Sequence, residues 1–397
     1  MRAYSDSSQE ALLARGLLKD WRGQGFITED QYLHMERETV CELRRTNIFL
    51  RAVLFLFTLF VVGAAAALFF FFLLPQGTSA PTAIFLLIFA ALSYAAAELA
   101  VSHYNFYRYG IEEALAVCAV AFLCTGISAI PFPGFQVQDG TEFLVPAAGA
   151  VASLWIWHRF GFPYAFPAAM IFVVWLPGYW TSSHSAQHLI VAAIYTVALI
   201  AVAAVRSRYR SSYLDEGYSI VEACLWLGIY LAINLQLSSL SLLAQWRGGP
   251  RTLSEFPGAF YWTTWVLTWC LPLAVLWRGL RRKDRLVIAV GGIAAILTLV
   301  TNKPYLGWQR HTWDPMILGA LLAGAALIIH RWLSAGPGGI RHGFTAKRLS
   351  DRDKRWMNAG STAFGLMAPH TGVPQTTRPE VKFGGGDSAG GGATSDF

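Results

Sequence analysis

The sequence predicts an all-α, polytopic integral membrane protein with about ten transmembrane helices. Hydrophobic residues make up 55% of the 397 residues and charged residues only 14%, against roughly 25% charged in ordinary soluble domains. Residues 52–74 carry no charged side chain, and a helix of this length crosses about 30 Å of hydrocarbon. Uncharged runs recur downstream, so we expect a transmembrane helical bundle over residues 51–333.

Residues 1–50 are predicted to form a cytoplasmic helical hairpin. Apolar residues recur every four positions over 9–23, which is typical of an amphipathic helix, and a pair of glycines ends this pattern. Thr28 and Gln31 have the spacing of a capping box, in which each side chain accepts the other residue's backbone N–H. We expect the second helix, which begins at Glu29, to continue directly into the first crossing.

Ten crossings are predicted from the apolar runs. They cover about residues 52–74, 82–101, 112–130, 143–157, 162–180, 187–205, 219–243, 258–277, 285–301 and 314–333. The fourth is short and contains Pro146, and the fifth contains three prolines. Residues 143–180 therefore have an alternative interpretation as a re-entrant hairpin, which leaves eight full crossings and does not change the orientation of the others.

The basic residues predict the orientation of these crossings. The connections on the side of the N-terminus contain Arg108, Arg159, Arg206, Arg208, Arg210, Arg278, Arg281, Arg282, Lys283 and Arg285. The opposite connections contain only Arg247, Arg251, Lys303 and Arg310. Because basic loops stay in the cytoplasm, we expect an even number of crossings with both termini cytoplasmic. The net charge of +7 is explained by this bias, so nucleic acid is not an expected partner.

Residues 334–397 are predicted to form a cytoplasmic tail, first basic and then glycine-rich and disordered. Its basic part has two interpretations, contact with anionic lipid or ordinary positive-inside charge. The residues concerned are Arg341, Lys347, Arg348, Arg352, Lys354 and Arg355.

Ionisable residues inside crossings are candidates for function because burying a charge in a membrane is unfavourable. Glu98 and Glu222 lie near the cytoplasmic ends of the second and seventh crossings, and with Arg108 they suggest a proton or cation site. Both carboxylates lie within about two turns of the interface, where a side chain reaches water. A purely structural role is therefore the preferred interpretation.

The seventh and eighth crossings each carry a polar stripe at helical spacing. The first stripe contains Tyr230, Asn234, Ser238, Ser241 and Gln245, and the second contains Tyr261, Thr264 and Thr268. Pro272 lacks a backbone N–H, so it should leave the carbonyl of Thr268 without its usual partner. The two stripes either line a water-filled vestibule or hold the helices together by hydrogen bonds, and the second role is the commoner one.

Two weaker patterns complete the candidates. His184 and His188 stand four residues apart and would face the same way on a helix, but no nearby third ligand supports a metal site. Small residues four apart, which allow close helix contact, occur at Gly63, Gly291 and Gly319. No phosphate loop, nucleotide fingerprint, nucleophile elbow or HExxH motif is present in the sequence, so neither a cofactor nor a catalytic residue is predicted.

The N-terminal region also resembles a known family. Its pattern is Trp21, the run Gly25-Phe26-Ile27-Thr28, Gln31, and a charged helix that leads into an apolar run. This pattern resembles predicted bacterial membrane proteins of the domain-of-unknown-function 2157 family, over about residues 12–75. The resemblance implies a bacterial cytoplasmic membrane protein with a cytosolic hairpin, and it supplies no catalytic residues.

Three functions are compatible with the sequence. The first is a non-enzymatic membrane scaffold or assembly component with membrane protein partners, and it is slightly preferred because no charge lies deep in the membrane. The second is a small-molecule or ion transporter or channel that uses the two polar stripes. The third is a membrane enzyme acting on a lipid-linked substrate through Asp139 and Glu142, and it is the weakest because no acid, base and nucleophile converge.

Overall fold

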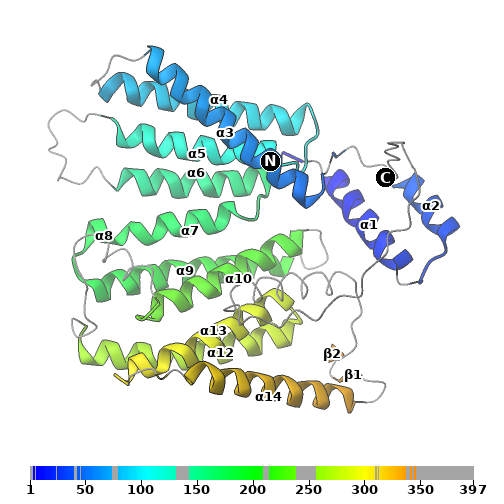
Figure 1. Ribbon diagram of the computed structural model, residues 1–397, viewed down its shortest axis with the longest axis vertical. Helices are drawn as coiled ribbons and strands as arrows, with labels where there is room; N and C mark the ends of the chain where they lie inside the picture. The colour runs from blue at the N-terminus through cyan, green and yellow to red at the C-terminus, as the bar shows by residue number, and fades with distance from the viewer. Residues whose placement is uncertain are drawn as a thin grey trace, which may run out of the picture. The chain divides into compact units, whose positions relative to one another are not determined.

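The described part of the computed structural model consists of helices joined by turns and loops, with one short β-ladder of two strands (Figure 1). The residues described are 3–4, 6–23, 25–39, 43–44, 46–73, 79–130, 143–208, 214–237, 256–308, 311, 313–336, 340–341 and 344–345. The ladder pairs β1 (Ile340–Arg341) with β2 (Phe344–Thr345) in antiparallel register. The chain divides into two units, Met1–Leu327 and Ile328–Phe397, and the contacts given below each lie within one unit.

The N-terminal hairpin consists of α1 (Asp6–Gly23) and α2 (Glu29–Glu38), which pack against each other. The predicted capping box is confirmed at the start of α2. The Thr28 hydroxyl accepts the N–H of Gln31 at 3.3 Å, and the Gln31 side chain accepts the N–H of Thr28 at 2.9 Å. These two bonds satisfy N–H groups that a helix start otherwise leaves without partners.

The expectation that the second helix continues into the first crossing is wrong. α2 ends at Glu38, and α3 (Ile48–Leu73) begins as a separate helix. At Thr39 both the hydroxyl and the backbone N–H donate to the carbonyl of Met35, at 2.7 and 3.1 Å. The carbonyl of Thr39 accepts the Arg15 guanidinium at 2.8 Å. Threonine bonds readily to nearby backbone in this way, and here it ends α2 and ties that end to α1.

Each of the ten predicted segments contains a helix. In chain order these are α3, α4 (Ser79–Ser102), α5 (Ile111–Ser128), α6 (Leu144–Phe160), α7 (Ala165–Trp175), α9 (His184–Arg208), α10 (Leu214–Ile233), α12 (Gly258–Arg282), α13 (Arg285–Tyr305) and α14 (Asp314–Ser334). Among the described residues, seven helices are long and apolar enough to cross a membrane: α3, α4, α5, α9, α12, α13 and α14. The described part of the chain is thus largely helical, and its seven candidate spans indicate a membrane protein.

Two predicted crossings differ from the helices found. In the fifth, α7 stops before Pro177, which begins the short α8 (Pro177–Trp180). Proline has no N–H to continue the preceding helix, and it is readily accommodated at the first position of a new one. The seventh was predicted over residues 219–243, but α10 ends at Ile233 and residues 235–237 form a turn. The side-chain oxygen of Asn234 accepts the N–H of Gln236 at 3.1 Å, and this local bond replaces the next helical one.

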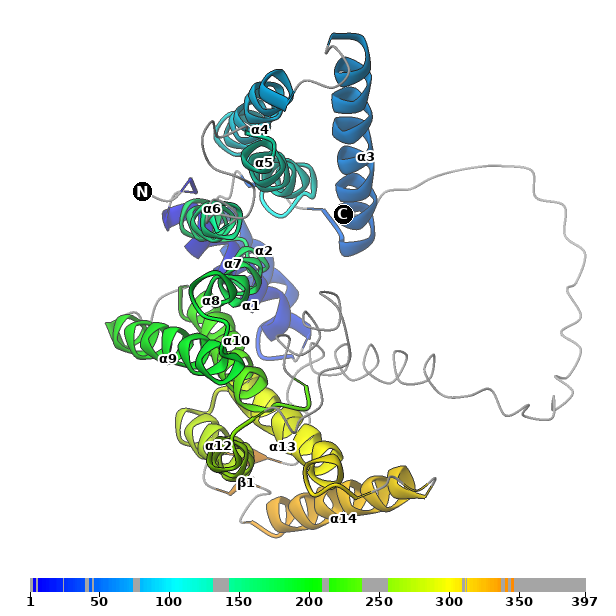
Figure 2. The same cartoon turned by 90° about the vertical axis from the view of Figure 1, so that its left-hand side faces the viewer.

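Helix packing follows the chain from one neighbour to the next within the first unit. α5 packs against α3, α4 and α6, and α6 packs against α7. α10 contacts α7, α9, α12 and α13. α12 and α13 are neighbours (Figure 2), and their contacts extend from Tyr261 and Tyr305 to Gly279 and Ile288. α10 is thus the helix on which several others meet. α14, in contrast, has no buried residue.

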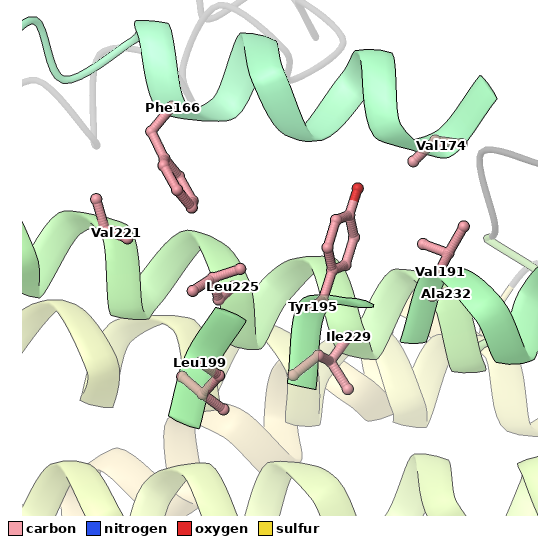
Figure 3. Close-up of a cluster of buried hydrophobic side chains, with 9 residues drawn as sticks. All are labelled: Phe166, Val174, Val191, Tyr195, Leu199, Val221, Leu225, Ile229 and Ala232. Carbon is pink, nitrogen blue, oxygen red and sulfur yellow. The ribbon is translucent and has the colours of Figure 1, made fainter. Parts of the chain in front are cut away.

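A hydrophobic cluster fills the space between α7, α9 and α10 (Figure 3). Its buried members are Phe166, Val174, Val191, Tyr195, Leu199, Val221, Leu225, Ile229 and Ala232. The ring of Tyr195 points at α7, where its hydroxyl donates to the carbonyl of Met170 at 2.6 Å. A Cβ atom at Gly228 would lie 2.3 Å from the Met170 side chain. The absence of a side chain at Gly228 therefore allows α7 and α9 to approach α10.

A second cluster anchors the N-terminal segment to the bundle. Tyr4 is buried among residues of α4, α5 and α6, including Phe160. The N–H of Ala3 donates to the carbonyl of Arg159 at 2.8 Å, at the end of α6. Further along, Arg44 forms an isolated β-bridge with Phe106 in the connection between α4 and α5. Residues near the N-terminus therefore lie against the ends of α4 and α6.

Close helix approach at small residues is confirmed at one of the three predicted glycines. A Cβ atom at Gly291 of α13 would lie 2.9 Å from the Leu276 side chain and 3.1 Å from its backbone nitrogen. At Gly63 and Gly319 the prediction is wrong, because a Cβ atom would meet no described atom within 4 Å. A tighter contact occurs at Gly110, where φ is +108° and a Cβ atom would lie 2.3 Å from the carbonyl oxygen of Arg51.

Candidate functional site on helices α10, α12 and α13

Helix α10 takes part in one charged and one uncharged group of buried polar residues; other buried polar residues lie elsewhere, among them Glu112 and Glu113 of α5. Glu222, near the start of α10, and Tyr230 and Asn234, at its end, are each fully buried. Glu222 and Tyr230 are eight residues apart, which corresponds to about 12 Å along a helix. The hydrophobic cluster of Figure 3 occupies the stretch of α10 between them. The two groups are therefore distinct features of one helix.

Glu222 is surrounded by arginines from two neighbouring helices. Its carboxylate accepts from Arg206 of α9 at 2.8 Å and from Arg278 of α12 at 2.5 Å, with Arg282 at 3.3 Å. Charged donors replace the water that a fully buried carboxylate loses. The three guanidinium groups do this for Glu222, so its carboxylate joins α10 to α9 and α12.

Asp284 extends this group to α13. Its carboxylate pairs with Arg206 at 2.6 Å and accepts the hydroxyl of Ser219 at 2.7 Å. The same carboxylate caps α13, accepting the N–H groups of Leu286 and Val287 at 3.1 and 3.4 Å. Asp284 thus contacts α9 and α10 while it begins α13, the position at which a negative charge also suits the helix dipole.

The pKa of Asp284 reflects these contacts. Burial by itself would raise the pKa of this carboxyl group, because desolvation disfavours the charged form. The hydrogen bond from Ser219 and the Arg206 guanidinium outweigh burial, and the pKa lies below its ordinary value of 3.8. Asp284 is therefore ionised at neutral pH.

The uncharged group is a chain of hydrogen bonds that runs from α10 through α13 to α12. The Nδ2 of Asn234 donates to the Tyr230 hydroxyl at 2.9 Å, and Tyr230 in turn lies 2.9 Å from the Thr298 hydroxyl. Thr298 Oγ1 lies 2.8 Å from the carbonyl oxygen of Thr268. With Asn234 as the first donor, each hydroxyl accepts one bond and donates the next. The single proton of the Thr298 hydroxyl is shared between the Thr268 carbonyl and the carbonyl of Ala294 in its own helix, which lies at 2.9 Å.

The carbonyl of Thr268 is the end of this chain for a local reason. Pro272, four residues further along α12, has no N–H to donate to it, as the sequence predicted. Thr298 supplies the missing donor from α13. The hydroxyl groups of Thr264 and Thr268 bond within α12, to the carbonyls of Tyr261 and Trp265 at 2.8 and 2.7 Å. Both threonines are buried, so they belong to this interface and not to an open surface.

Two further residues of α13 close the network. Asn234 Nδ2 also donates to the hydroxyl of Thr301 at 3.0 Å. The hydroxyl of Tyr305 accepts the N–H of Leu235 at 2.6 Å, just after α10 ends, while the Tyr305 carbonyl accepts the hydroxyl of Tyr261 at 2.6 Å. Tyr305 therefore holds the end of α10 and the start of α12 at once.

The partners on α13 were not among the predicted site residues. Thr298, Thr301 and Tyr305 follow spacings of three and four, so they form a polar stripe of the same kind as those found on the seventh and eighth crossings. That spacing could have predicted a polar face on the ninth crossing. The buried role of Arg206 and Asp284 was harder to predict, because charged residues at helix ends are usually solvated.

Glu98 makes its ion pair elsewhere in the bundle. It pairs with Arg159 of α6, whose Nε lies 3.2 Å from Glu98 Oε2, whereas Glu222 pairs with arginines of α9 and α12. Arg108 lies over the ring of Tyr107, 5.5 Å from its centre. The three residues of the suggested proton or cation site thus have different partners. A comparable pair joins α3 to α5, where Arg51 Nε donates to Glu113 at 2.7 Å.

The two histidines turn their rings to different partners. The Nδ1 of His188 lies 2.7 Å from the carbonyl oxygen of Ala232, and the Nδ1 of His184 lies 3.2 Å from Gln187. Within the part of the chain that the structure describes, no group of three or more His, Cys, Asp or Glu residues is placed to hold a metal ion. His188 instead links α9 to the last turn of α10.

Several predicted residues lie outside the described residues. These are Ser238, Ser241 and Gln245 of the first polar stripe, Asp139 and Glu142, and the tail residues Lys347, Arg348, Arg352, Lys354 and Arg355. Arg341 is described. Its guanidinium lies 4.8 Å from the ring centre of Trp332 and donates to that residue's carbonyl at 3.2 Å.

No protein-family model, curated protein or solved structure matches this chain. The arrangement of charged and polar residues on α9, α10, α12 and α13 therefore carries the functional argument by itself.

Proposed function

We propose that the chain is a non-enzymatic scaffold or assembly component of a bacterial cytoplasmic membrane. The observation that carries this proposal is that the buried polar groups on α10, α12 and α13 form their hydrogen bonds with one another. Asn234, Tyr230 and Thr298 satisfy one another and end on the carbonyl of Thr268. Buried polar groups that are paired in this way hold helices together and leave little capacity for a substrate. The bacterial location comes from the resemblance of the N-terminal region to the domain-of-unknown-function 2157 family.

The proposed topology has ten crossings with both termini in the cytoplasm. Connections assigned to the cytoplasmic side meet one another in the fold: Arg44 bridges Phe106, and Ala3 bonds to Arg159. The contact of Ala3 and Tyr4 with the end of α6 supports a full crossing by α6 over the re-entrant alternative, because the N-terminal segment then lies on the side where α6 ends. Arg206, Glu222, Arg278 and Asp284 likewise gather connections assigned to this side.

The proposed partners are the bilayer and other membrane proteins. No residue of α14 is buried, and α3 exposes Phe57, Phe60 and Phe71. In a membrane such surfaces are covered by lipid or by another protein. We propose that the tail after Gly336 makes the protein contacts, and that its basic residues, Arg341 among them, add attraction to anionic lipid.

Native mass spectrometry of the protein extracted in lipid particles tests the scaffold role. The full chain is compared with a chain that ends at Gly336. A protein partner that is present only with the tail is the expected result. A second variant keeps the tail and removes its basic residues. It replaces with Gln the residues Arg341, Lys347, Arg348, Arg352, Lys354 and Arg355. Loss of lipid but not of the protein partner in this variant separates the two kinds of contact. An isolated protein in every preparation contradicts the proposal.

Transport is the second candidate, and the early end of α10 favours it. Transporters often bind ions or substrates where a helix is interrupted within the membrane, and α10 ends at Ile233 beside buried Asn234. This function predicts that Asn234→Leu abolishes flux in proteoliposomes while the protein stays folded. The matched control is Thr263→Val, which changes an exposed residue of α12. Unchanged flux in Asn234→Leu removes Asn234 from the pathway.

A further inference from the structure

A cavity at the C-terminal end of α12 has no role in the scaffold proposal. It has a volume of about 350 Å³ and is lined by Trp277, Arg278, Arg281 and Arg282. This volume lies at the lower end of the range of about 300–1,000 Å³ that is usual for small-molecule sites. Its walls are basic and aromatic, and this composition indicates the charge of the ligand.

The described lining of the cavity contains three arginines and no acidic side chain. Arg278 and Arg282 are bonded to Glu222, whereas Arg281 is exposed and lies over the ring of Trp277. The full positive charge of Arg281 outweighs the partial negative charge that the C-terminus of a helix contributes. An anion is therefore the expected occupant.

The arginines also indicate which anion. A guanidinium group presents several N–H donors in a plane and matches the oxygens of a phosphate, often with two parallel bonds. Arg281 is exposed and lies over the ring of Trp277, 5.4 Å from its centre, so it stands at the wall of the cavity and is not committed to Glu222. A phosphate-bearing ligand can thus bind Arg281 without breaking the buried ion pairs.

An apolar surface leads along α12 to the same cavity. Leu273, Trp277 and Leu280 follow spacings of four and three, so they share one face, and they are 67%, 64% and 48% exposed. α12 is one of the helices long and apolar enough to cross a membrane. Acyl chains would cover this face, and tryptophan is enriched at the level of the headgroups. A ligand with an apolar tail below its phosphate fits both features.

We propose that the cavity formed by Trp277, Arg278, Arg281 and Arg282 binds the phosphate headgroup of an anionic phospholipid, whose acyl chains lie along Leu273, Trp277 and Leu280. The inference depends on insertion of α12 in a membrane and not on the scaffold role. It concerns a different part of the chain from the basic tail. The site would select lipids with a net negative headgroup and place them at one interface of the bundle.

Native mass spectrometry of the full chain in nanodiscs tests this site. Nanodiscs of phosphatidylcholine alone are compared with nanodiscs in which phosphatidylglycerol is mixed with phosphatidylcholine. We expect retention of phosphatidylglycerol in preference to phosphatidylcholine. Arg281→Gln should weaken that binding roughly tenfold, because it removes a charge-assisted bond. Trp277→Leu keeps every charge and should weaken it roughly threefold through the lost ring contact, so it serves as an independent variant.

Arg331→Gln is the matched control. It removes the same charge near the end of another apolar helix, α14, and should leave phosphatidylglycerol binding unchanged. Equal retention of the two lipids by the unmodified protein overturns the proposal, and so does an equal loss in Arg281→Gln and Arg331→Gln. Inorganic phosphate is added in a separate arm. Complete displacement of the lipid by inorganic phosphate at low concentration would identify a site for a soluble anion and would also overturn the proposal.

Discussion

At the scale of single residues, Thr298 is the centre of the uncharged network. Its hydroxyl lies within hydrogen-bonding distance of Tyr230 on α10 and of the Thr268 carbonyl on α12. It is 3% exposed, so water cannot replace it readily. Removal of this hydroxyl leaves the Thr268 carbonyl without its donor and takes one partner from Tyr230, which keeps its bond from Asn234.

Thr298→Val is therefore expected to lower the free energy of unfolding by about 1–2 kcal/mol. Denaturant titration in mixed micelles measures this change. Thr263→Val is the control, because Thr263 is exposed and bonds only within its own helix, to Ala259. In a Pro272→Ala background position 272 regains an N–H for the Thr268 carbonyl, so the cost of Thr298→Val should be smaller. An equal cost in both backgrounds contradicts the assigned role of Thr298.

Asp284 predicts a dependence of stability on pH. Its pKa is lower in the folded protein than the ordinary value of 3.8. The stability that it contributes is therefore fully present above pH 3.8 and is lost as the pH falls through the folded pKa. Asp284→Asn should reduce the free energy of unfolding by about 2 kcal/mol at neutral pH. Its difference from the unmodified protein should narrow as the pH is lowered below 3.8. A difference that stays constant down to pH 2 would show that the ionised carboxylate is not the cause.

At the scale of elements, the connections between helices are as informative as the helices. Gly110 precedes α5 with φ at +108° and lies against the backbone of α3 at Arg51. Both the conformation and the space exclude other residues. Gly161, which ends α6, also has a positive φ, at +70°, but a Cβ atom there would meet nothing within 4 Å. The two glycines separate the effect of backbone strain from that of close packing.

Gly110→Ala is expected to destabilise the protein by more than about 3 kcal/mol, because strain and a backbone clash add together. Gly161→Ala should cost only about 1–2 kcal/mol, the strain of a left-handed residue. Thermal unfolding of the two variants in the same detergent makes the comparison. Similar losses at both positions would mean that α3 moves away from α5 with little resistance.

Local features of the fold could be predicted, and contacts between distant helices could not. The capping box at Thr28 and the loss of the helical partner of the Thr268 carbonyl follow from residues three and four positions apart. The end of α10 was missed because the bond from Gln236 to Asn234 competes with the helix and leaves no apolar signal. The pairing of α10 with α13 depends on packing between segments far apart in sequence, which periodicity does not encode.

At the scale of the whole molecule, the proposed topology makes a prediction about accessibility. Ser183, between α8 and α9, should face the outside, and Lys283, between α12 and α13, should face the cytoplasm. His158 in α6 is also exposed and should be reached from the cytoplasm only if α6 crosses fully. To test this, the natural cysteines are replaced and one cysteine is introduced at each position in turn. The reaction of that cysteine with a labelling reagent then shows on which side of the membrane the position lies.

A membrane-impermeant maleimide applied to intact cells should label Ser183→Cys and spare Lys283→Cys and His158→Cys. After permeabilisation all three should react. Absence of labelling at His158→Cys from both sides supports the re-entrant hairpin with eight crossings. Labelling of Lys283→Cys in intact cells reverses the proposed orientation.

The ion pair between Arg51 and Glu113 sets an order of events during synthesis. The two residues are separated by 62 positions, and a ribosome adds about 5–20 residues per second. Roughly 3–12 s therefore pass between the addition of Arg51 and the addition of Glu113 to the growing chain. During that time α3 must hold its place in the membrane alone, with the arginine kept at the water interface. The ion pair can therefore stabilise α3 only after the start of α5 has been synthesised. A pause in this interval would leave α3 without its bond to Glu113.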